Sequence, residues 1–269
     1  MAYFNLNGRR AYYEVYGKSD KTLMILNGIM MSTSSWLPFI PMLMKTTKVV
    51  LVDFFDQGKS DFMSEAYTQD IQLELVEALL DALDLEQVTL LGISYGGEIA
   101  MKCRSSRVTQ LILVNTTAVT DEALKAIGNN WINAAQTYDG SQFFNATIPP
   151  IYSKGFYNVR IDWLSEREKM FKIAFKPAWY EGFIRLVRSA ESHDERLRLH
   201  EIKVPTMIIG AEEDVITPLK CQSEINTAIQ ESKLVVIKDC GHASMYEKPT
   251  EFFSVVVGFM MCGYDQFNF

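Results

Sequence analysis

The chain has 269 residues, of which 48% are hydrophobic and 22% are charged, a composition typical of a globular protein and too apolar for a disordered one. Its formal net charge of −7 would repel a phosphate backbone or an anionic membrane surface, so nucleic acid is not expected as a partner. Four cysteines without a Cys-x-x-Cys pair and only three histidines argue against a metal site, and no cofactor is expected.

Short β-rich runs alternate with helical patterns through the first half of the chain, which predicts βαβ units around a mostly parallel sheet. Asn7-Gly8 between the first two runs is a strong hairpin signal, so the sheet is expected to begin with an antiparallel pair. Eight strands are predicted: Ala2–Leu6, Arg10–Tyr16, Thr22–Leu26, Lys48–Val52, Val88–Leu91, Gln110–Val114, Thr206–Ile209 and Lys233–Ile237. The predicted fold class is therefore α/β.

Helical patterns fill most intervals between these strands. Residues 68–85 place apolar side chains on one face and acidic ones on the other, which predicts a helix that covers the sheet. A second helix is predicted over residues 219–229. The apolar stretch 252–262 is too short to span a bilayer and predicts a buried helix. The first residues show neither the basic nor the apolar region of a secretory signal, so a cytoplasmic location is expected.

The alternation stops between the sixth and seventh predicted strands. Residues 118–200 have a helical, aromatic-rich pattern that is broken once, by Pro149-Pro150. Such a segment needs aromatic side chains for a core of its own, and some of them should face a pocket if the segment is a lid. The predicted domains are a core of residues 1–117 and 201–269 and a helical insertion of residues 118–200.

The pattern Gly-x-Ser-x-Gly follows the fifth predicted strand and precedes a helical run. This context is that of a nucleophile elbow, in which a strained turn presents the serine at the tip of the sheet. Gly92 and Gly96 remove Cβ atoms that would clash in the turn. Ser94 is therefore the predicted nucleophile, and the backbone N–H of Tyr95, at the start of the helix, is a predicted oxyanion donor.

A serine nucleophile needs a base, and the base needs an orienting carboxylate. His242 lies just past the last predicted strand, at the edge where the sites of open α/β sheets collect, and is the predicted base. His193 and His200 lie in a charged helical stretch and are expected to be exposed.

The orienting acid is expected after the seventh predicted strand. Asp214, Glu212 and Glu213 all occur in that loop. We predict Asp214, because the order Ser, Asp, His after successive strands matches the elbow arrangement.

A second oxyanion donor is expected in the loop after an early strand. There the Ile29 N–H could point at the oxyanion, and Gly28 would allow close backbone approach. Gly28, Met30 and Trp36 are predicted to line an apolar substrate pocket. The polar turn 53–60 lies at the same edge and is interpreted as structural.

These features resemble the α/β-hydrolase fold superfamily over nearly the whole chain. The similar segments are the nucleophile elbow at Gly92–Gly97, the acid loop at Gly210–Pro218, and the histidine loop at Gly241-His242 with Glu247-Lys248-Pro249. The resemblance implies that the 118–200 insertion is a helical cap that shapes the substrate site. It also excludes the members that open epoxides or displace halides, because these carry aspartate where this chain has Ser94.

Two positions depart from the pattern of that superfamily. Asp56 replaces the first glycine of its Asp-x-x-Gly-x-Gly-x-Ser turn, and Asn27 replaces the usual histidine of the oxyanion loop. Because the oxyanion donor is a backbone N–H, the second change should spare catalysis while altering the hydrogen bonding beside the pocket.

The expected function is that of a cofactor-free serine hydrolase acting on a small, largely apolar ester, lactone or related acyl substrate. One alternative is a ligand receptor or signalling module that kept the fold and turns over slowly. Another is a thioesterase, acyltransferase or carbon–carbon bond hydrolase that uses the same three residues.

Overall fold

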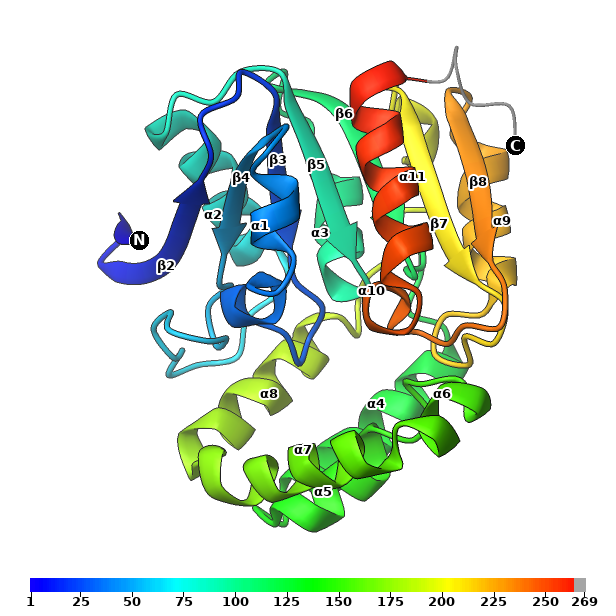
Figure 1. Cartoon of the computed structure of the whole chain (residues 1–269). Helices are drawn as coiled ribbons and strands as arrows, with labels where there is room; N and C mark the ends of the chain where they lie inside the picture. Colours follow the sequence, from blue (N-terminus) through cyan, green and yellow to red (C-terminus); the bar gives the residue numbers. More distant parts are fainter. Residues whose placement is uncertain (264–269) are drawn as a thin grey trace.

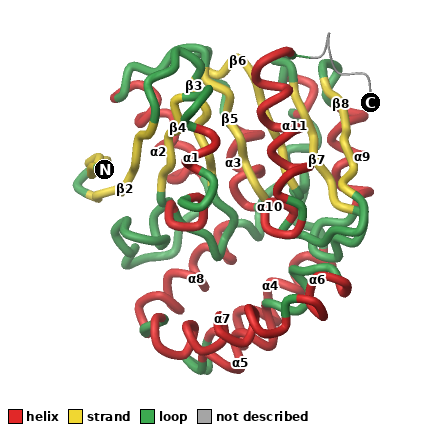
Figure 2. Tube along the Cα trace, viewed as in Figure 1, coloured by secondary structure: helices red, strands yellow, loops and turns green. Residues whose placement is uncertain are grey.

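Eight strands form one sheet in the computed structural model, which describes residues 1–263 (Figures 1 and 2). The strands are β1 (Ala2–Leu6), β2 (Arg9–Tyr16), β3 (Thr22–Leu26), β4 (Lys48–Val52), β5 (Val88–Ile93), β6 (Val108–Val114), β7 (Thr206–Ala211) and β8 (Ser232–Ile237). Their order is β1-β2-β4-β3-β5-β6-β7-β8. β2 pairs antiparallel with β1 and β4, and all other pairs are parallel. The predicted α/β class with a mostly parallel eight-stranded sheet is confirmed.

Helices cover both faces of the sheet (Figure 1). One face carries α2 (Asp70–Ala82), α3 (Tyr95–Lys102) and α9 (Leu219–Ala228), and the other carries α1 (Ile40–Leu43) and α11 (Pro249–Cys262). Strands β3 and β5 are buried along their whole length, which explains why their sequences are continuous apolar runs. The remaining short elements are α10 (Ser244–Glu247) and two 3-10 helices, Thr33–Trp36 and Leu199–Glu201. No helix within residues 1–263 is long and apolar enough to cross a membrane.

Five helices lie between β6 and β7, beyond the carboxyl ends of the parallel strands (Figure 1). They are α4 (Glu122–Ala135), α5 (Gly140–Thr147), α6 (Lys154–Val159), α7 (Ile161–Ala174) and α8 (Pro177–Ser189). Their side chains form a hydrophobic cluster distinct from the two clusters of the sheet. At its centre the ring of Phe143 is fully buried, edge-on to Phe183 and Tyr180. The insertion thus has a core of its own.

The two ends of the insertion are held together beside the sheet. Val119 and Asp194 form an isolated antiparallel bridge, and the Thr120 N–H donates to the His193 carbonyl at 3.0 Å. The prediction that His193 is exposed is wrong: only 2% of it is exposed, and its Nε2 donates to the Thr117 carbonyl at 3.0 Å. Burial lowers the pKa of His193 to about 4, so the ring is neutral at pH 7. His200 is exposed, as predicted.

A buried ion pair joins the insertion to the core. Asp56 accepts hydrogen bonds from Arg185 of α8 at both carboxylate oxygens, at 2.6 and 3.0 Å. A Cβ added to Gly182 would lie 3.1 Å from Asp56, so the helix approaches this turn closely. The aspartate that departs from the superfamily pattern therefore serves as an attachment point for α8.

We predict that Arg185→Met destabilises the protein by about 2–3 kcal/mol in urea-induced unfolding, because it leaves the Asp56 carboxylate buried without its counter-charge. Adding Asp56→Asn to the same chain should recover part of this loss. The control is Arg10→Met, which breaks the ion pair between Arg10 and Asp61. Because 62% of the arginine side chain is exposed, we expect no resolvable change in the free energy of unfolding. Equal losses in Arg185→Met and Arg10→Met would contradict the assignment.

Candidate active site

Ser94 stands between the end of β5 and the start of α3 in a strained backbone conformation. Its φ is 53° and its ψ is −120°, a combination that costs a non-glycine residue free energy. The Ser94 N–H donates to the Val114 carbonyl at 2.9 Å, and its own carbonyl accepts from the Thr116 hydroxyl at 2.8 Å. These two bonds to the neighbouring chain segment hold the turn in place.

Two glycines are required by the contacts of this turn. A Cβ added to Gly92 would lie 2.3 Å from the Gly96 carbonyl oxygen. One added to Gly96 would lie 2.3 Å from the carbonyl oxygen of Leu26, at the end of β3. Both distances are far below van der Waals contact, so the strand, the turn and the helix can meet only without these side chains.

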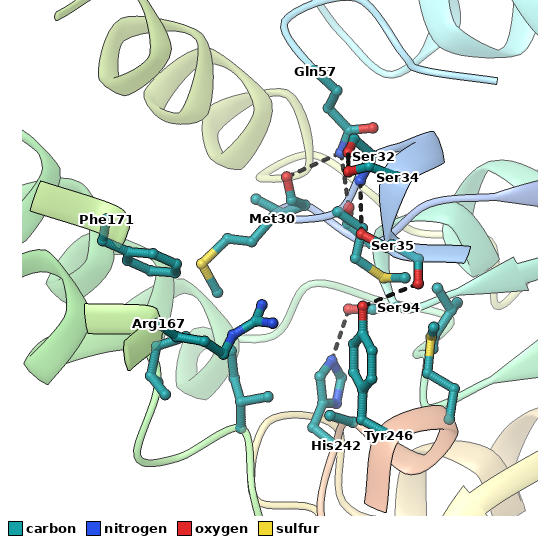
Figure 3. Close-up of a pocket in the computed structure, with 18 of the residues that line it drawn as sticks. Met30, Ser32, Ser34, Ser35, Gln57, Ser94, Arg167, Phe171, His242 and Tyr246 are labelled. Atoms are coloured by element: carbon teal, nitrogen blue, oxygen red, sulfur yellow. Dashed lines mark hydrogen bonds between the residues drawn. The ribbon is translucent and has the colours of Figure 1, made fainter. Parts of the chain in front are cut away.

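The structure brings the three predicted residues together, and Figure 3 shows two of them, Ser94 and His242. Ser94 Oγ lies 3.0 Å from His242 Nε2, and His242 Nδ1 lies 2.8 Å from Asp214 Oδ2. The imidazole side chain is 10% exposed and the carboxylate is fully buried. Because the carboxylate can only accept from Nδ1–H, Nε2 of the neutral ring is left as an acceptor for the serine hydroxyl.

The Asp214 carboxylate accepts hydrogen bonds from several fixed donors. The backbone N–H groups of Ile216 and Thr217 donate to Oδ1 at 2.8 and 3.0 Å. The Thr217 hydroxyl and the Asn115 amide donate to Oδ2 at 3.0 and 2.9 Å. Burial alone would raise the pKa of Asp214, but the charge and hydrogen bond of His242 and these donors hold it below its ordinary value.

The two rival acids point elsewhere. Both Glu212 and Glu213 are exposed, and the Glu212 carboxylate accepts from the Asp239 N–H at 3.0 Å. Of the three acids in this loop, only Asp214 contacts His242.

The two residues predicted as oxyanion donors lie near Ser94: Tyr95 follows it in the chain, and Ile29 lines the same cavity. Tyr95 is the first residue of α3, so its N–H has no partner within the helix. Within residues 1–263 the Ile29 N–H donates no hydrogen bond, and Ile29 lines the cavity in front of Ser94. The Gln57 amide donates to the Gly28 and Ile29 carbonyls at 2.8 and 3.0 Å and so fixes this loop.

Asn27 supports the same loop from below. Its amide donates to the Val52 carbonyl at 2.8 Å, and its carbonyl oxygen accepts from the Trp36 indole N–H at 2.8 Å. The side chain is 1% exposed, so its hydrogen bonds are made within the core. The expectation that Asn27 alters the hydrogen bonding beside the pocket is therefore corrected: its hydrogen bonds lie in the core, behind the loop that borders the pocket.

A cavity of about 640 Å³ opens in front of Ser94 and His242. Gly28 and Met30 line it, as predicted, and a Cβ added to Gly28 would touch the Ser94 Cβ at 3.5 Å. The prediction for Trp36 is wrong, because its ring is fully buried in the hydrophobic cluster on the face of the sheet that carries α1 and α11 and is absent from the cavity wall. The insertion contributes aromatic lining residues, among them Trp131, Phe156, Trp163, Phe171, Phe175 and Trp179.

Several supporting residues escaped the sequence reasoning. Asn115 follows β6 directly, and a polar residue at the carboxyl end of a buried strand is the same signal that pointed to His242. Gln57 lies in the turn that was interpreted only as structural. Glu247, which the resemblance placed in the histidine loop without a role of its own, accepts from the N–H groups of Gly241 and Ser153, each at 3.0 Å, and so ties that loop to the insertion. Among residues 1–263 no group of three or more His, Cys, Asp or Glu residues could hold a metal ion.

A sequence model of the alpha/beta hydrolase fold family matches residues 21–249. The chain belongs to this family. A solved structure of MGS-M2, an alpha/beta hydrolase enzyme from a Medee basin deep-sea metagenome library, has a TM-score of 0.94 and 38% identity, covering 100% of this chain and 99% of that one.

Two curated relatives of the family are more distant in sequence. The AB hydrolase superfamily protein YisY of Bacillus subtilis (strain 168) is 29% identical over 77% of this chain and 79% of its own length. The 2-hydroxymuconate semialdehyde hydrolase of Pseudomonas sp. (strain CF600) is 26% identical over 88% of this chain and 86% of its own length.

Glu98, one turn into α3, makes the stability of this hydrolase fold depend on pH. It is buried and accepts a hydrogen bond from Gln69. Burial raises the pKa of Glu98 from 4.5 to about 8, whereas the unfolded chain keeps the ordinary value. The stability that the neutral acid contributes is therefore full below about pH 4.5 and is lost as pH rises through about 8.

We predict that Glu98→Gln removes this loss. Relative to wild type, the variant should gain on the order of 3 kcal/mol in urea-induced unfolding between about pH 5 and about pH 9. Glu65→Gln changes an exposed carboxylate and should follow the wild-type curve at every pH. A wild type that gains stability over Glu98→Gln with rising pH would contradict the sign.

Proposed function

We propose that the protein is a cofactor-free serine hydrolase that cleaves a small, largely apolar ester, lactone or related acyl compound. The observation that carries the proposal is the chain of two hydrogen bonds from Ser94 through His242 to Asp214, beside a cavity that both Ser94 and His242 line. Membership of the hydrolase family supports it.

In the proposed reaction the Ser94 oxygen attacks the acyl carbonyl while its proton passes to His242 Nε2. The carbonyl oxygen becomes an anion, which the N–H groups of Ile29 and Tyr95 stabilise. The tetrahedral adduct collapses, the leaving oxygen takes the proton from the imidazolium, and an acyl-enzyme remains. Water then attacks the acyl group, its proton goes to Nε2, and Ser94 leaves with a proton as the acid product is released. Asp214 holds the imidazole in the required tautomer throughout.

The helices of the 118–200 insertion serve in this proposal as a cap. Their aromatic side chains form the wall of the cavity opposite Ser94, and the sheet-side loops form the other. A cavity of about 640 Å³ with a mostly apolar wall suits a small acyl compound.

Labelling with a fluorophosphonate probe tests the nucleophile. We expect the wild type to be labelled covalently at one site, and labelling to be lost in Ser94→Ala and strongly slowed in His242→Ala. With an activated ester, a burst followed by sustained turnover supports the hydrolase, and a single slow turnover supports the receptor alternative. Labelling that persists in Ser94→Ala would contradict the proposal.

The identity of the acid gives a second prediction. Asp214→Asn should lower kcat by about 10⁴-fold, because the imidazole loses the acceptor that fixes its tautomer. Glu213→Gln, one residue away and exposed, is the matched control and should keep the wild-type kcat. Steady-state kinetics of both variants on one ester measure these kcat values. A larger loss of kcat in Glu213→Gln than in Asp214→Asn would reject Asp214 as the orienting acid.

A further inference from the structure

The charged side chains that line the cavity without an ion-pair partner are positive. Three charged side chains line it: Asp56, Arg160 and Arg167. The carboxylate of Asp56 is fully buried and already paired with Arg185. Within residues 1–263 neither Arg160 nor Arg167 has a carboxylate within 4.0 Å. In a chain whose net charge is −7, the charged side chains that line this cavity without a carboxylate partner are thus both cations.

Arg167 of α7 is the inner of these two cations. Figure 3 shows its guanidinium pointing from the helix toward the space in front of Ser94 and His242. Its Nε is buried and has no hydrogen-bond partner. Arg160, in contrast, is exposed.

Aromatic rings hold the Arg167 guanidinium without using its donors. Its central carbon lies 4.7 Å from the ring centroid of Trp163 and 5.8 Å from that of Tyr246. Stacking of this kind orients the guanidinium plane, but it satisfies none of the N–H groups. Because buried donors in proteins are almost always hydrogen-bonded, we expect the Arg167 Nε–H to find its acceptor in a molecule that enters the cavity.

We propose that Arg167 binds a free carboxylate of the substrate, so that the preferred substrates are half-esters or lactones of dicarboxylic acids. The planar fork of a guanidinium matches a carboxylate with two parallel hydrogen bonds. The apolar wall between Arg167 and Ser94 would hold the carbon chain that separates the carboxylate from the acyl group attacked. This inference rests on the proposed hydrolase function and narrows it to a substrate class.

The test compares the monomethyl and dimethyl esters of dicarboxylic acids from succinic to suberic acid, which differ at each length in one charge. We expect wild type to hydrolyse the best monoester with a kcat/KM at least about 10-fold above that of its diester. Arg167→Met should lower this ratio about 10- to 100-fold, mainly through KM, and Arg167→Lys should restore part of it. Lys169→Met, on the same helix and paired with Glu166, is the matched control and should keep the wild-type ratio.

Two kinetic results would overturn the inference: a wild type that hydrolyses the diester as well as the monoester at every length, or an Arg167→Met variant that loses both activities equally. A binding experiment separates this failure from that of the proposed function. Calorimetry on Ser94→Ala should detect the free dicarboxylate that matches the best monoester, and Arg167→Met in the same background should abolish binding. Tighter binding of inorganic phosphate than of the dicarboxylate would also overturn it.

If the dicarboxylate binds but no ester of the series is hydrolysed by wild type, the carboxylate site stands and the proposed hydrolase function fails. If neutral esters are hydrolysed and the carboxylate has no effect on kcat/KM or on binding, the hydrolase function stands and only the role of Arg167 fails.

Discussion

The arrangement of the site depends on one close approach of backbone to backbone at the carboxyl end of the central strands. Gly92 and Gly96 bring β5, the turn and α3 together within distances that admit no Cβ, and Gly96 also lies against the last carbonyl of β3. This packing holds Ser94 at a positive φ and so decides where its hydroxyl points. The loop after β3 and the loop after β8 reach the same point because parallel neighbours end at one edge of the sheet. The position of every other group in the site is set relative to this turn.

Three buried carboxyl groups near the turn show how the surroundings of a carboxyl group decide what it does in the fold and whether burial favours its neutral form. Asp214 is surrounded by hydrogen-bond donors and His242, which keep it ionised. Asp56 is compensated by Arg185, and the resulting pair joins the sheet to α8. Glu98 accepts a hydrogen bond from the Gln69 amide, and burial raises its pKa to about 8. The first arrangement orients an imidazole, the second attaches a helix, and the third favours a neutral acid in the core.

The elbow could be predicted from the sequence because strain at Ser94 demands glycines at fixed offsets. The central parallel strands could be predicted because they are continuous apolar runs. Long-range contacts were not readable in the same way. His193 looked exposed among charged neighbours, yet its burial depends on Thr117, which is 76 positions away. The sequence does not distinguish Trp36 from a pocket aromatic, because what holds it in the core is the hydrogen bond that its indole N–H donates to the Asn27 side chain. The unpaired state of the Arg167 Nε depends on side chains from distant parts of the chain, such as Tyr246, and no spacing within α7 could reveal that.

The bridge between Val119 and Asp194 has a consequence for how this fold can change. Loop-closure entropy grows only slowly with the length of a loop, and here the two ends of the insertion are already pinned to each other. The entropy cost of pairing β6 with β7 is therefore close to that of a short connection, and it does not depend on the helices beyond the bridge. Helices can be lengthened, exchanged or given new side chains without altering the register of the strands. The sheet and the insertion can therefore diverge at different rates.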